Sequence, residues 1–266
     1  MARKSRLSKS RSSKSRPAKM GRKWTQDDML TYKIKVVYQD LQTFFGITDL
    51  PAPNVENDDA LTAQDVTAAT KQWTGNMLLH LRDVDQAEPA DRRATTIDFV
   101  RELFTLIRYW SIAPTRLVRM RQPLLFLGSQ GRPPQVDICI VDDTHAIFLA
   151  VKMDSHLRGS DLEPRLISEA IAAFHNNNNL RAKFFGTDPL TSKVMPGIVM
   201  DGSMPTFYKI PITPELVKAV ESGERPEEET IVYAYRPEVP RPEEGIRPLD
   251  NRFIILSCFE AFRRFM

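Results

Sequence analysis

The spacing of apolar residues changes along the chain from a helical period to an alternating one. Helical spacing predicts helices at 24–45, 62–81, 96–110, 162–180, 213–222 and 250–265. Alternating or continuous apolar runs predict strands at 116–127, 136–141, 146–152, 194–201, 205–211 and in the segment TIVYAY. From Thr96 to Asp201 the order is therefore helix, three strands, helix and strand.

This order predicts an α/β fold. The short connections between the first three strands favour an antiparallel meander, and the long helix at 162–180 permits a crossover to a further strand. We expect a three-layer sandwich around a mixed central sheet. The chain then divides into a basic tail at 1–23, a helical N-terminal region at 24–95, an α/β core at 96–212 and a C-terminal extension at 213–266 that packs on the core.

Composition limits the kinds of site that the chain can hold. Its 266 residues and 42% hydrophobic content suit one globular domain. The two cysteines, Cys139 and Cys258, lie in apolar runs without a CxxC or Cys/His cluster, which argues against zinc and favours a reducing compartment. No apolar run reaches the roughly 20 residues of a membrane span, and no apolar secretory segment opens the chain. The phosphate-loop, dinucleotide-binding, zinc-protease and serine-hydrolase motifs are absent from the sequence.

Charge is distributed unevenly. Met1 to Lys23 carries ten Lys/Arg and no acid, which leaves 27 basic against 34 acidic residues, a net charge of −7, for the rest. This tail is too polar to offset its ordering entropy, so we expect it to be disordered. It could act as a nuclear localisation signal or as an arm that binds the phosphates of DNA or RNA. A solubilising tail or a mitochondrial presequence remain open, and the expected location is the nucleus, otherwise the cytoplasm.

The order of elements resembles the core of the PD-(D/E)xK, or restriction-endonuclease-like, superfamily. In that superfamily one core strand brings an Asp and the next brings Glu-x-Lys. Two carboxylates hold Mg²⁺, and the lysine stabilises developing charge. A closer resemblance, over about Phe104 to Tyr235, is to a family of uncharacterised, mostly mushroom-type fungal proteins assigned to this fold. It is carried by VDICIVDD, EPRLISEAIAAFHNNN, MPGIVMDGSMPTFYKIPIT and AVESGERPEEETIVYAY.

The resemblance supplies candidate site residues and also a departure from the motif. Asp137 matches the Asp of the first strand. The fungal family's second strand ends in Leu-Val-Gln-Glu-Asp-Lys, and laid on this chain Met153 stands for the Glu and Ser155 for the Lys. Methionine cannot replace the Glu, because Mg²⁺ prefers hard oxygen ligands, and serine cannot supply the positive charge of the Lys. Lys152 and Asp154 are the nearest substitutes. They lie on the opposite strand face, so a bulge is needed to turn them toward Asp137.

Other polar residues have two interpretations each. Glu102 could bring a further acid to the metal from the helix before the sheet, or could be a solvated helix residue. Arg165 and Glu169 lie four apart on one helix, so they could form a surface ion pair, or lie beside Asp137 with Arg165 contacting phosphate. Asn176 to Asn179 would cap a helix end, and their amides could touch nucleic acid.

Together these observations imply a nuclease-like protein whose site is degenerate, which needs no cofactor and which acts as a nucleic-acid-associated or protein-interaction module. An active Mg²⁺-dependent nuclease is the alternative, with Asp137, Lys152 and Asp154 as catalytic residues and Asp137 and Asp154 as metal ligands. A structural or adaptor protein whose acidic body binds a basic partner is a third. The sequence leaves open whether the chain is an enzyme.

Overall fold

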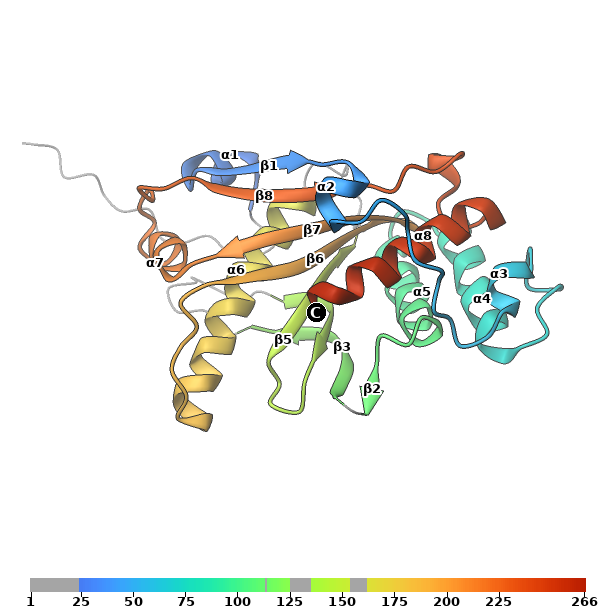
Figure 1. Ribbon diagram of the computed structural model, residues 1–266, viewed down its shortest axis with the longest axis horizontal. Helices are drawn as coiled ribbons and strands as arrows, with labels where there is room; N and C mark the ends of the chain where they lie inside the picture. Colours follow the sequence, from blue (N-terminus) through green and yellow to red (C-terminus); the bar gives the residue numbers. More distant parts are fainter. Residues whose placement is uncertain (1–23, 113, 125–134, 154–161) are drawn as a thin grey trace, which may run out of the picture.

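The computed structural model describes residues 24–112, 114–124, 135–153 and 162–266, so the basic tail and Asp154 lie outside the described residues. The described strands form one eight-stranded mixed sheet with the order β1-β8-β7-β6-β5-β4-β3-β2 (Figure 1). The strands are β1 Ile34–Tyr38, β2 Ser111–Ile112, β3 Thr115–Pro123, β4 Gln135–Val141, β5 Ile147–Met153, β6 Lys193–Asp201, β7 Met204–Ile212 and β8 Thr230–Tyr235. The helices are α1 Gln26–Thr31, α2 Leu41–Phe45, α3 Asp59–Thr62, α4 Gln72–Gln86, α5 Arg92–Leu106, α6 Leu162–Leu180, α7 Pro214–Ser222 and α8 Leu249–Phe262.

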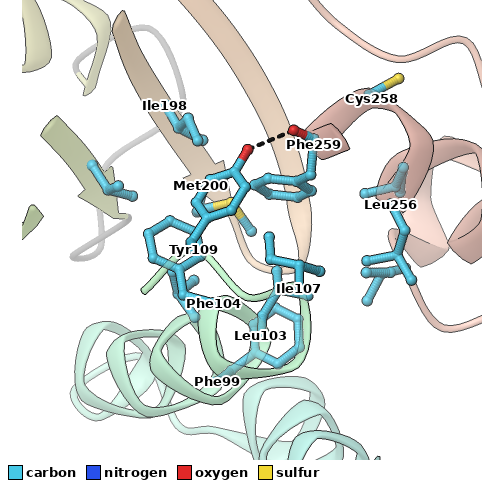
Figure 2. Close-up of a cluster of buried hydrophobic side chains, with 14 of the residues drawn as sticks. Phe99, Leu103, Phe104, Ile107, Tyr109, Ile198, Met200, Leu256, Cys258 and Phe259 are labelled. Carbon is cyan, nitrogen blue, oxygen red and sulfur yellow. Dashed lines mark hydrogen bonds between the residues drawn. The ribbon is translucent and has the colours of Figure 1, made fainter. Parts of the chain in front are cut away.

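Helices cover both faces of the sheet. One apolar core joins the sheet to α4, α5 and α8, and a second joins its other face to α1, α6 and α7. Figure 1 shows α8 on one face and α6 on the other. The predicted α/β class and mixed sheet are therefore confirmed. Figure 2 shows the first core, where the Tyr109 hydroxyl donates to the carbonyl of Phe259 at 2.6 Å and ties the end of α5 to α8.

The central elements follow the predicted order. Strands β3, β4 and β5 form an antiparallel meander, and α6 crosses over to β6, which runs parallel to β5. Helix α6 has the predicted bounds. It lies close to the sheet because Gly197 has no side chain: a Cβ there would lie 3.0 Å from Leu166 Cδ2. The Asn177 side chain exchanges two hydrogen bonds with the main chain of Ile147, at 2.8 and 2.9 Å, and so fixes α6 to the start of β5.

The N-terminal region differs from the prediction. The single helix expected over 24–45 is wrong, because Lys33 adopts a φ of 51° and the chain continues as strand β1. This strand pairs in parallel with β8, with Val36 opposite Val232. Its β-branched residues suit a strand, although their spacing also fits a helix. The region 24–95 therefore contributes an edge strand to the sheet as well as helices.

Two further boundaries also differ. The helix predicted at 62–81 is replaced by the short α3 and by α4 at Gln72–Gln86. The last helix begins at Leu249, with Pro248 at the N-cap. Asp250 therefore lies in the first turn, where it pairs with Arg241.

Candidate functional site

Asp137 and Lys152 face each other on neighbouring strands. Strands β4 and β5 pair Cys139 with Ala150 and Ile138 with Val151, and the same register places Asp137 opposite Lys152. Lys152 Nζ lies 3.4 Å from Asp137 Oδ2. The Lys152 side chain is only 2% exposed, and that of Asp137 is fully buried. A lysine and an aspartate that are withdrawn from water in this way must neutralise each other or find further partners.

Both residues have further charged partners. Lys152 Nζ donates to Oε1 of Glu169 on α6 at 2.7 Å, and Glu169 is also fully buried. The Arg93 guanidinium at the start of α5 donates to Asp137 Oδ1. Two cations and two carboxylates thus form one network of ion pairs, which joins helices on opposite faces through the end of the sheet. We call Arg93, Asp137, Lys152 and Glu169 the charge cluster.

The two carboxylates of the charge cluster differ in how many further hydrogen bonds their oxygens can accept. Both oxygens of Asp137 accept hydrogen bonds: Oδ1 from Arg93, and Oδ2 from the backbone N–H of Met153 at 3.1 Å, with the Lys152 ammonium close by. Oε2 of Glu169 has no partner among the described residues. Burial raises the pKa of Glu169 to about 7, and the neighbouring Lys152 opposes that rise. Glu169 therefore changes its protonation near neutral pH.

The expected orientation of the second strand is wrong. We expected Lys152 to point away from Asp137 unless a bulge turned it. The irregularity in this pairing lies at Ile140 and Val141, and Lys152 faces Asp137 without one nearby. Met153 instead is buried in the apolar core on the opposite face. The residue that shares the strand face of Lys152 at the Glu position of Glu-x-Lys is therefore Ala150, which has no ligand atom.

The other candidates fall into three groups. Asp154 lies outside the described residues. Glu102 pairs with Arg101 at 3.0 Å and is largely buried; it lies nine residues after Arg93, about 13 Å further along α5, so neither of its expected roles matches its position. Glu169 pairs with Lys152, which also contacts Asp137, so the alternative of a surface pair with Arg165 is wrong and the alternative that places Glu169 near Asp137 agrees with the structure. The contact of Arg165 with phosphate stays a prediction. Arg165 Nε is buried without a hydrogen-bond partner among the described residues.

The sequence analysis did not identify Arg93 as a candidate site residue. The helix that carries it was predicted to begin at Thr96, which left Arg93 in a loop, whereas α5 begins at Arg92. Its side chain is 23% exposed, so it forms the side of the charge cluster that is open to solvent. A predicted helix start one turn earlier would have placed Arg93 in the first turn of the helix, from which its side chain could reach the end of the sheet.

As they stand, these residues do not fit the Mg²⁺ that the resemblance implies. Mg²⁺ requires several oxygen ligands in near-octahedral geometry. Among the described residues, no group of three or more His, Cys, Asp or Glu is arranged to hold a metal. In Asp137, the carboxylate that would be expected to bind it, the oxygens already accept from nitrogen donors. What the arrangement does is neutralise two buried carboxylates with two cations of the same chain.

No model of a known protein family matches this sequence, and comparison with the curated proteins also gives no match. The resemblance to the fungal family therefore depends on the four quoted segments. In the part of the chain that the structure describes, no helix is both long and apolar enough to cross a membrane.

Proposed function

We propose that this chain is a nuclease-fold protein that binds nucleic acid without cleaving it, because cations of its own chain occupy the place of the catalytic metal. The observation that carries the proposal is the state of Asp137. Arg93, Lys152 and the Met153 N–H together satisfy its carboxylate, and Ala150 stands where the motif would bring a second acid from the strand.

The arrangement of elements supports a restriction-endonuclease-like core. Helix α5, the meander β3-β4-β5, the crossover helix α6 and the parallel strand β6 follow the order of that core. Asp137 and Lys152 occupy adjacent strands on one face, as the Asp and the Lys of the motif do. Loss of the strand acid with retention of these two residues is consistent with a site that once bound metal.

The basic tail supplies a means of association with DNA or RNA. Its ten cations without an acid favour phosphate binding that is independent of base sequence. The same composition is typical of a nuclear localisation signal, so we propose a nuclear location. Phosphorylation of its serines would weaken both roles by adding negative charge.

An active Mg²⁺-dependent nuclease is the second candidate. Two observations favour it: Lys152 lies between two carboxylates, and Oε2 of Glu169 has no partner among the described residues. In this candidate Asp137 and Glu169, with Asp154 as a further acid, would hold the metal, which would have to displace Arg93.

A combined binding and cleavage assay tests the proposed function. We expect the full chain to bind labelled DNA and RNA at low salt, with an affinity that falls steeply as salt increases, and to release no product with Mg²⁺ or Mn²⁺. Deletion of Met1 to Lys23 should weaken binding. The proposal is wrong if metal-dependent cleavage occurs and disappears in Lys152→Met, a result that selects the second candidate. Absence of binding by the full chain would instead favour the adaptor protein.

A further inference from the structure

Strand β3 lies in an arginine-rich stretch of a chain that is otherwise acidic outside its basic tail. From Ile107 to Val136 the chain has five arginines and no Asp or Glu. Outside the tail, the whole chain has more acids than bases. Three of these arginines, Arg116, Arg119 and Arg121, lie on β3 itself. A local excess of positive charge on an otherwise acidic protein creates a surface that attracts anions.

The strand lies at an edge of the sheet. Strand β2 pairs only with Thr115 and Arg116, so from Leu117 onward no described strand covers the outer edge of β3. Arg119 and Arg121 are exposed. Arg119 is opposite Cys139. Met120 pairs with Ile138 and Gln122 with Val136, so the same register places Arg121 opposite Asp137. The two arginines thus lie one strand away from the charge cluster.

Arg119 and Arg121 have no carboxylate partner among the described residues, unlike two other exposed arginines of the chain, Arg108 and Arg247. Arg108 pairs with Glu56 at 2.6 Å, and Arg247 pairs with Asp85 at 2.5 Å. No acid of the residues that the structure describes holds Arg119 or Arg121 in an ion pair of this kind. Charged residues, lysine above all, also protect an edge strand from pairing with other chains. Protection of the edge therefore does not explain why every charge on β3 is an arginine.

We propose that the exposed edge of β3 binds the sugar-phosphate backbone of a nucleic acid through Arg119 and Arg121, and so directs it past the charge cluster. This inference rests on the proposed function, to which it adds a binding surface on the folded body, separate from the tail. Guanidinium groups bind phosphate oxygens in a bidentate manner, and unpaired ones lose no internal ion pair on binding. Such backbone contacts would fix position and carry no base specificity.

The experiment compares two double variants of the full chain. Arg119→Gln with Arg121→Gln removes the proposed contacts. Lys218→Gln with Arg225→Gln removes the same charge from exposed positions around α7 and serves as the matched control. The probe is a short labelled DNA of mixed sequence, single-stranded or double-stranded, and anisotropy is measured over a range of salt concentrations. All four positions are exposed, so thermal melts should be close to those of the wild type.

We expect the salt dependence to decrease only in the β3 variant. The slope of log affinity against log salt should fall by about 1.5, since each lost phosphate contact contributes about 0.7–0.9. The control should keep the wild-type slope. Equal slopes in all three proteins, or equal losses in both variants, would overturn the inference and leave tail binding intact. If a polyglutamate probe binds more tightly than DNA and responds to the same change, the surface fits an acidic protein instead. Absence of DNA binding by the wild type would defeat the proposed function itself.

Discussion

Replacing Lys152 with methionine is expected to lower the free energy of unfolding by about 3–5 kcal/mol, the range for breaking a buried ion pair from one side. Methionine keeps much of the apolar stem, so the loss reflects charge more than packing. Without the ammonium, Asp137 and Glu169 are two buried carboxylates with only Arg93, at the margin of the cluster, to offset them. Urea denaturation near pH 8, where Glu169 is ionised, measures the effect.

Two controls separate charge from packing. Lys218→Met changes the same residue type at an exposed position and should alter stability by less than about 0.5 kcal/mol. Glu169→Gln in the Lys152→Met background should restore part of the loss, because it removes one of the uncompensated charges. If Lys152→Met costs less than about 1 kcal/mol, or if Glu169→Gln restores nothing, the cluster does not hold the two carboxylates as described.

Glu169 is expected to make stability decrease as pH rises toward neutrality. Burial raises its pKa from 4.5 to about 7. The unfolded chain loses this proton near pH 4.5, whereas the folded protein keeps it to about pH 7. The contribution of this group is therefore complete below pH 4.5, decreases between pH 4.5 and 7, and is lost above that. At about 1.36 kcal/mol per pH unit, the decrease is about 3 kcal/mol.

Glu169→Gln isolates this contribution from other titrating groups. The free energy of unfolding of the variant should vary less than that of the wild type between pH 5 and 7. The difference between the two proteins should shift in favour of the variant as pH rises. Parallel curves for wild type and variant over this range would mean that Glu169 is ionised throughout and that its burial does not dominate its protonation.

Local pattern was sufficient for some elements and not for others. Helix α6 was predicted with its observed bounds because its helical pattern of apolar residues extends over many residues and the segments on either side differ from it in composition. Strand β1 was not predicted, because the spacing of Met29, Tyr32 and Val36 fits a helix. Only the pairing of β1 with β8, about 200 residues later in the sequence, makes this segment a strand.

The candidate site shows the same division. Asp137 and Lys152 could be singled out by residue type and position. Their shared face could not, because the orientation of a strand depends on its register with its neighbour, and a shift of one residue reverses every side chain. Glu169 had two interpretations, a surface pair with Arg165 or a position beside Asp137, since nothing local shows which side of α6 faces the sheet end. Arg93 comes from a helix on the opposite face of the sheet, and only the tertiary structure shows that its side chain contacts Asp137.

The central claim is that cations of the chain take the place of a metal, and Arg93→Ala tests it most directly. Arg93 is the solvent-facing member of the cluster, so its removal frees Oδ1 of Asp137 where an ion can enter. The measurement is the shift in Tm caused by Mn²⁺. We predict no shift for the wild type and a rise of about 3–5 °C for Arg93→Ala if Mn²⁺ is present at about ten times its Kd, with the rise lost when Asp137→Asn is added. An Asp137-dependent rise in the wild type that Arg93→Ala does not increase would contradict the claim.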